Sequence, residues 1–239
     1  MRINKYLSEC GVCSRREADV LIEEGLVMVN ETKALFGMQV EENDLVTVRG
    51  EKVCRPEKHV YLAFYKPVGI VCTAEKKEKN NLIDFLNYPR RITYAGRLDK
   101  ESEGLLLLTD DGDLIDALMT GSNGHEKEYV VTVAHSLTKE KLQKMAAGLY
   151  LEDIKRRTKP CKVWKSGEQE FHIVLTQGIN RQIRRMCKQV GLRVTRLERI
   201  RIGEIRSGNL AAGKYRELNE EEFFWLKKLK ENSRKSNLR

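Results

Sequence analysis

The chain has 239 residues, of which 41% are hydrophobic and 33% are charged, and its formal net charge is +9. This hydrophobic content is enough for a folded core, so the high charge does not indicate disorder. The excess of Lys and Arg favours a polyanionic partner, because Lys and Arg displace counterions from phosphates. An anionic membrane is the competing partner, but no apolar run approaches the roughly 18 residues of a spanning helix. We expect a soluble, cytoplasmic protein that does not bind membranes.

The cysteines and histidines do not predict a metal site. Cys10 and Cys13 form one C-x-x-C pair, and the other four cysteines are scattered. A structural zinc site normally needs a second close pair of Cys or His, and none of the four histidines has that spacing. There is also no Walker loop and no G-x-G-x-x-G segment. We therefore expect no metal and no cofactor, with the cysteines as packing thiols in a reducing compartment.

Residues 1–49 are predicted to form one compact unit. Ile3, Tyr6 and Leu7 give an apolar face for a first short helix. Ser14 and Glu17 have the spacing of a capping box at the start of a second helix over residues 15–24. Gly25 ends that helix, and two short strands follow at 26–30 and 44–48.

This unit resembles the S4 RNA-binding module, with which it shares Arg2, Lys5, Ser14, Arg15, Arg16, Glu17, Ala18, Gly25 and Asn30. The resemblance implies an RNA-contacting face that carries Lys5, Arg15, Arg16 and Lys33. The alternative is a solvated helix face, because two adjacent arginines are common on any helix.

The rest of the chain reads as a polar connector and a second, larger domain. Residues 50–60 have the composition of a linker, residues 61–230 form the second domain, and residues 231–239 form a disordered tail. Strands are predicted at 60–65, 70–73, 105–109, 129–133, 171–175 and 199–205, and helices at 81–86, 113–119, 139–147, 181–190 and 220–230. This order, with its long connections, predicts an α+β fold around a mixed, largely antiparallel sheet flanked by helices.

The segment from Gly96 to Thr109 is the most informative in the chain. A single carboxylate, Asp99, lies between Arg97 and Lys100 and precedes a polar turn and a run of four leucines that reads as a buried strand. Nearby cations favour the ionised form of a carboxylate. The alternative is a solvated loop carboxylate paired with Lys100.

The segment resembles the central motif of the pseudouridine synthases that modify ribosomal RNA, in which the Asp is the essential catalytic residue. Two further segments, residues 126–129 and 178–186, match that family in the same order, and the resemblance covers nearly the whole chain. It is closest to the branch that includes large-subunit pseudouridine synthase F. The resemblance implies that uridine is isomerised to pseudouridine without a cofactor.

The resemblance also implies three catalytic residues. Asp99 acts as nucleophile at ribose C1′ or as base at C2′, and the sequence leaves both routes open. Tyr129, at the start of an alternating strand, packs against the base and assists proton removal at C5. Arg184 pairs with Asp99 from a helix whose apolar face carries Ile183 and Met186.

The remaining expectations concern RNA. The target uridine must be flipped out of its stack, and Arg97 is placed to brace the vacated position. Lys100, Asn180, Arg181 and Gln182 are expected to line the RNA entrance. The expected substrate is large-subunit (23S) ribosomal RNA, and we expect a monomer. The alternatives are a transfer RNA anticodon loop with the same chemistry, or a non-catalytic factor for ribosome assembly.

Overall fold

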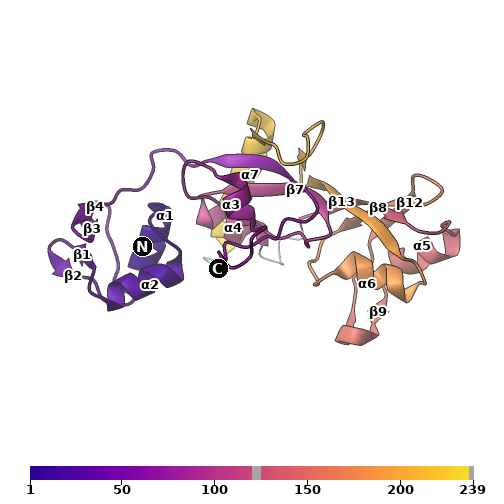
Figure 1. Cartoon of the computed structure of the whole chain (residues 1–239), viewed down its shortest axis with the longest axis horizontal. Coiled ribbons are helices and arrows are strands. Elements are labelled where there is room, and N and C mark those ends of the chain that lie inside the picture. The colour runs from indigo at the N-terminus through magenta and orange to yellow at the C-terminus, as the bar shows by residue number, and fades with distance from the viewer. Residues whose placement is uncertain (120–124, 237–239) are drawn as a thin grey trace. The chain divides into compact units, whose positions relative to one another are not determined.

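The structure is a computed structural model that describes residues 1–119 and 125–236, and it divides into two compact units (Figure 1). The first unit contains Met1–Val60 together with two short segments, Tyr88–Thr93 and Thr109–Gly112. Within it, Asp110 accepts a hydrogen bond from the Val60 amide at 2.9 Å and pairs with Arg90. The second unit contains the remaining described residues. Within the described ranges, no helix combines the length and the apolar character needed to cross a bilayer.

The first unit has two helices and a small antiparallel sheet. The helices are α1 (Ile3–Glu9) and α2 (Arg15–Glu23). The sheet has the order β2-β1-β3-β4, formed by Thr32–Lys33, Val27–Val29, Val46–Val48 and Glu51–Lys52. Ile3, Leu7, Ala18 and Ile22 from the helices pack against the valines of β1 and β3 in one core. The two helices and the strands β1 and β3 thus each bury one face.

The local signals in this unit are confirmed, whereas its shortest strands were not predicted. The capping box at Ser14 is present, because the Ser14 side chain accepts from the Glu17 amide and the Glu17 side chain accepts from the Ser14 amide. The strands β2 and β4 have two residues each, all four exposed. The β4 strand pairs with β3, so the predicted connector of residues 50–60 is wrong at its start, where residues 51–52 belong to the sheet.

The second unit is built on a mixed sheet of nine strands, as predicted. Its main path is β11-β12-β8-β13-β7-β5-β15, with β14 paired to β13 and β6 paired to β7. The bounds are β5 Tyr61–Lys66, β6 Thr93–Ala95, β7 Glu103–Thr109, β8 Lys127–Val133, β11 Lys162–Lys165, β12 Glu170–Leu175, β13 Val194–Ile202, β14 Ile205–Arg206 and β15 Tyr215–Glu217. The β13 and β7 strands run parallel, whereas β11 with β12, β12 with β8, β8 with β13, β13 with β14 and β15 with β5 are antiparallel pairs.

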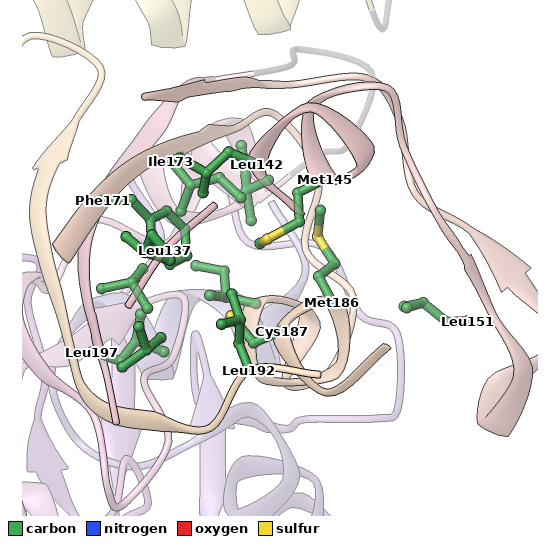
Figure 2. Close-up of a cluster of buried hydrophobic side chains, with 14 residues drawn as sticks. Leu137, Leu142, Met145, Leu151, Phe171, Ile173, Met186, Cys187, Leu192 and Leu197 are labelled. Atoms are coloured by element: carbon green, nitrogen blue, oxygen red, sulfur yellow. The ribbon is translucent and has the colours of Figure 1, made fainter. Parts of the chain in front are cut away.

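Helices pack against this sheet around two cores. They are α3 (Leu82–Leu86), α4 (Gly112–Met119), α5 (Lys139–Ala146), α6 (Gln182–Gln189) and α7 (Glu220–Ser236). In one core, the α5 and α6 side chains meet those of β8 and β12, and Figure 2 shows Met145 lying beside Met186 there. The second core joins α4 and α7 to β7. A separate two-stranded sheet, β9 (Tyr150–Leu151) with β10 (Arg156–Arg157), flanks the short helix η2 (Glu152–Ile154).

Two predictions for this unit are wrong. Residues 70–73 form no strand, only an isolated bridge between Val71 and Asn81. The α7 helix continues to Ser236, so residues 231–236 are helical where a disordered tail was predicted. This extension carries few apolar residues, which is why periodicity did not reveal it. The last three predicted tail residues, 237–239, lie outside the described residues.

Candidate active site

A cleft with a volume of about 460 Å³ opens in the second unit, at the ends of its central strands. One wall is the loop from β6 to β7, which carries Gly96, Arg97, Leu98 and Asp99. The floor comes from β8 and β13, through Lys127, Tyr129, Leu197 and Arg199. The segment from Leu175 to Ile183, which links β12 to α6, also lines the cleft.

Asp99 lies at the start of a tight turn that leads into β7. The Ser102 amide donates to the Asp99 carbonyl oxygen at 3.0 Å, and the Gly69 amide donates to the Lys100 carbonyl oxygen at 2.8 Å. The turn is therefore held from both sides. The carboxylate is 29% exposed and faces the cleft, where a substrate can reach it.

The arginine next to Asp99 is Arg181. Its Nη1 lies 3.8 Å from Asp99 Oδ2 and 2.8 Å from Glu101 Oε2. The hydrogen bond from Arg181 lowers the pKa of the Glu101 carboxyl. Arg181 adopts a left-handed backbone conformation, with φ of 53°, directly before α6.

Arg184 does not form the predicted pair with Asp99 in the described structure. Its Nη2 donates to the Glu101 carbonyl oxygen at 3.0 Å and to Ser102 Oγ at 3.3 Å. Arg184 therefore holds the turn behind the carboxylate and is not among the residues that line the cleft. The sequence pattern indicated the correct helix and the correct neighbourhood, but the wrong contact.

Tyr129 is one of the residues that line the cleft. It stands in β8 opposite Ile173 of β12 on one side and Arg199 of β13 on the other. Lys127, two residues earlier, points to the same side of the sheet. Burial, with a smaller contribution from the Arg199 guanidinium, lowers the pKa of Lys127 to about 8.

Arg199 is the most unusual residue of the cleft. It is only 2% exposed, its Nε donates to the Leu105 carbonyl oxygen at 2.7 Å, and its Nη2 is buried without a hydrogen-bond partner. Among the described residues, four buried side-chain nitrogens lack a partner, and three of them belong to the cleft residues His125, Gln177 and Arg199. Buried polar groups are normally satisfied. Three residues of the cleft lining therefore each carry a buried nitrogen for which the described structure gives no hydrogen-bond partner.

The predicted RNA-contacting residues fall into three groups. Arg97, Asn180, Arg181 and Gln182 line the cleft, although Gln182 is 4% exposed and accepts from the Ile179 amide, which gives it a structural role. Lys100 lies outside the lining and is 3.9 Å from Glu78. Lys5, Arg15, Arg16 and Lys33 lie in the first unit: Lys5 is 3.7 Å from Glu9, and the other three are exposed.

Sequence reasoning missed three basic residues of this region, namely Lys66, Lys127 and Arg199. Lys66 is fully buried at the end of β5, its Nζ donates to the Pro67 carbonyl oxygen at 2.7 Å, and burial lowers its pKa. Asp99 is one of the charges that oppose this shift in pKa. The sequence signal that could have revealed them is a basic residue in a strand with several apolar residues, either at its end, as for Lys66, or in its middle, as for Arg199. In the described part of the chain, no three His, Cys, Asp or Glu side chains are grouped closely enough to hold a metal.

Comparison with known proteins agrees with this geometry. The family model for RNA pseudouridylate synthase matches residues 60–189, and the S4 domain model matches residues 1–46. The chain is 46% identical over 235 residues to the dual-specificity RNA pseudouridine synthase RluF of Escherichia coli, covering 98% of this chain and 80% of the relative. It is 34% identical to the ribosomal large subunit pseudouridine synthase B of Bacillus subtilis, covering 98% of each chain.

A solved structure supports the same assignment. A crystal structure of a pseudouridylate synthase superposes with a TM-score of 0.69 at 28% identity, covering 96% of this chain and 99% of the other. Together with the sequence matches, this likeness spans both units. The chain belongs to the RNA pseudouridylate synthase family and carries an N-terminal S4 domain.

Proposed function

We propose that this enzyme isomerises a specific uridine of large-subunit (23S) ribosomal RNA to pseudouridine, with Asp99 as the essential catalytic group. The observation that carries the proposal is the cleft, in which the Asp99 carboxylate and the Tyr129 ring both line one space. The relatives named for the ribosomal large subunit support the choice of RNA. The +9 net charge is consistent with such a substrate.

The chemistry needs a carboxylate beside the sugar and a surface beside the base. Asp99 can attack ribose C1′ or remove the C2′ proton, and both routes release the base from C1′. Tyr129 offers a flat ring on the cleft floor, against which the detached base can stack while it turns. Loss of the C5 proton after the base rejoins the ribose, together with uptake of a proton at N1, completes the isomerisation.

Arg184 then acts as a positioning residue rather than as the partner of Asp99. Its two hydrogen bonds fix Glu101 and Ser102, and the Ser102 amide in turn holds the Asp99 carbonyl. Arg181 is the guanidinium that faces the carboxylate.

RNA is held, in this proposal, by both parts of the chain. Arg97 braces the stack from which the uridine is flipped, at a cost of a few kcal/mol. Lys100, Asn180 and Arg181 contact the strand that enters the cleft. Lys5, Arg15, Arg16 and Lys33 form the RNA face of the S4 domain. We further propose a domain boundary near residue 60 and a cytoplasmic monomer, because each unit has its own core and all six cysteines are free.

A transfer RNA anticodon loop is the second candidate substrate. The relative of E. coli is named a dual-specificity RNA pseudouridine synthase, which supports a second RNA for this chain as well. Mapping of pseudouridine in ribosomal and transfer RNA from cells with and without the gene separates the two. Loss at one 23S position alone supports the first proposal, and loss in transfer RNA alone contradicts it.

Asp99→Asn tests the catalytic assignment directly. The amide keeps the shape of the carboxylate and removes its charge, so we expect turnover to disappear while RNA binding stays close to that of the wild type. Tritium release from RNA labelled at uridine C5 measures turnover, and a filter-binding titration measures affinity. Substantial turnover by Asp99→Asn would exclude Asp99 as the catalytic group.

A further inference from the structure

We propose that Lys127 and Arg199 form an anion subsite on the floor of the cleft that binds a carbonyl oxygen of the uracil while the base is detached from the ribose. The inference deepens the proposed function and rests on it.

The arginines of β13 show that Arg199 is an exception. Arg196 contacts the carboxylates of Glu103 and Glu198 at 2.6 and 2.8 Å. Arg201 contacts those of Glu126 and Glu128 at 3.0 and 2.9 Å. Arg199, between them in the strand and more buried than either, has no carboxylate partner among the described residues. A buried charge without a counterion costs free energy. Because the two more exposed arginines of the same strand have carboxylate partners, we infer that the counterion of Arg199 comes from a bound group outside the protein.

Lys127 adds a second uncompensated cation at the same place. It lines the cleft with Arg199, and Arg199 is the charged group that acts on its pKa within the described structure. Two neighbouring cations repel each other. An anion that enters the cleft beside both residues relieves this repulsion and supplies the counter-charge that the Arg199 guanidinium lacks.

The depth of the subsite favours the base over a phosphate. Arg199 is tied to the Leu105 carbonyl and is 2% exposed, so only a group inserted deep into the cleft reaches it. Tyr129, which flanks Arg199 in the sheet, provides the ring against which the base stacks. The flipped base is the part of the substrate that enters deepest, whereas the phosphodiester chain stays at the mouth.

The detached base is an anion in either chemical route. When the bond between C1′ and N1 breaks, its electron pair stays on the uracil and spreads from N1 onto O2 and O4. C1′ meanwhile bonds to Asp99, or C2′ passes a proton to Asp99. Rotation about the N3–C6 axis then exchanges N1 with C5 and O2 with O4. A fixed cation pair can therefore bind O2 before the rotation and O4 after it. C5 finally bonds to C1′ with the electron pair of the anion, which makes the base neutral, while the bond from C1′ to Asp99 breaks or Asp99 returns its proton to C2′. The proton on C5 then leaves and N1 takes up a proton, so the product is neutral.

The test uses full-length enzyme, an RNA substrate and the variant Lys127→Met, which removes the charge and keeps much of the side-chain volume. We expect the single-turnover rate at saturating enzyme to fall by about 10- to 100-fold, with unchanged RNA affinity and salt dependence. Lys127→Arg should restore most of the rate. Lys162→Met is the matched control, because Lys162 is a β11 lysine paired with Glu126 and outside the cleft.

A second substrate separates anion stabilisation from a purely structural role. RNA with 5-fluorouridine at the target position releases a more stable base anion, so its consumption should depend less on Lys127. We expect the rate deficit of Lys127→Met to be smaller with this RNA than with uridine. Arg199→Lys, which keeps the charge and loses the planar donor, provides an independent variant at the buried position, with a urea titration to verify its folding.

Each alternative outcome is distinct. Equal deficits with the two substrates would overturn the anion subsite, and so would a wild-type rate for Lys127→Met. If Lys127→Met weakens RNA binding and lowers the salt dependence of affinity, but leaves the single-turnover rate at saturating enzyme unchanged, Lys127 binds a phosphate instead. If the wild-type enzyme forms no pseudouridine in ribosomal or transfer RNA, the proposed function itself fails, and the subsite is withdrawn with it.

Discussion

At the scale of single residues, Lys127 carries a charge that the folded protein disfavours. Its pKa falls from the ordinary 10.5 to about 8, chiefly through burial. Between these two values the unfolded chain binds more protons than the folded one, so stability increases with pH across this window. Below pH 8 the folded protein bears the full free-energy cost of burying the Lys127 charge. Such a cost is expected for a group whose charge a substrate anion neutralises.

Replacing Lys127 should therefore stabilise the free enzyme at neutral pH. We expect Lys127→Met to raise the free energy of unfolding at pH 7 by roughly 1–3 kcal/mol, and the difference from wild type to shrink as pH rises from 8 toward 10.5. Urea unfolding at a series of pH values measures this. Lys162→Met should show no such trend, since that side chain is 73% exposed. A constant difference at every pH would mean that the charge of Lys127 is not the cause.

Arg184 should affect the rate through the turn that it holds. Its hydrogen bonds to Glu101 and Ser102 fix the segment that begins at Asp99, so Arg184→Ala allows the carboxylate to move relative to the ribose. We expect the single-turnover rate to fall by about tenfold or more without a change in salt slope. Arg184→Lys should recover part of the rate, because an ammonium can reach one of the two oxygens. A change confined to salt-dependent affinity would place Arg184 on the RNA-binding surface instead.

At the scale of elements, the parallel pairing of β7 with β13 sets the geometry of the site. Gly104 of β7 faces Arg199 of β13, with φ of 104°, and a Cβ there would lie 2.4 Å from the Arg199 carbonyl oxygen. We expect Gly104→Ala to separate the strands and to lower both the melting temperature and the turnover. Gly208→Ala is the control, because Gly208 also has positive φ but open space around its Cβ position. A melting temperature equal to that of the control would show that the strands can shift at low cost.

Features that depend on local sequence could be predicted, whereas features that depend on which strands are neighbours could not. The capping box at Ser14 depends on neighbours within a few residues, and that prediction is confirmed. The subsite of Lys127 and Arg199 depends on which strands lie next to each other. The parallel pairing of β7 with β13, which buries Arg199, joins segments far apart in the chain. No periodicity in a single strand reveals that pairing.

At the scale of the whole molecule, the chain combines a small RNA-binding unit with a catalytic unit, each with its own core. The exposed basic residues of the S4 domain and the Asp99 carboxylate therefore belong to separate units. Affinity for RNA and the rate of the chemical step should be separable by mutation. This separation could be predicted from composition and motifs, whereas the helical end of α7 and the two-residue strands could not, because they lack a hydrophobic pattern.

The S4 domain provides the test of that separation. We expect Arg15→Ala combined with Arg16→Ala to weaken RNA binding and to lower the salt slope by about one for each phosphate that is no longer neutralised. The single-turnover rate at saturating enzyme should stay at the wild-type value, since neither residue lines the cleft. Arg156 and Arg157 of β10 are the matched control, as two adjacent exposed arginines in the catalytic unit. If alanine at 156 and 157 lowers the slope as much as alanine at 15 and 16, the phosphate-binding residues are not concentrated on the S4 domain. A reduced saturated rate for the S4 variant would instead mean that this domain takes part in placing the uridine in the cleft.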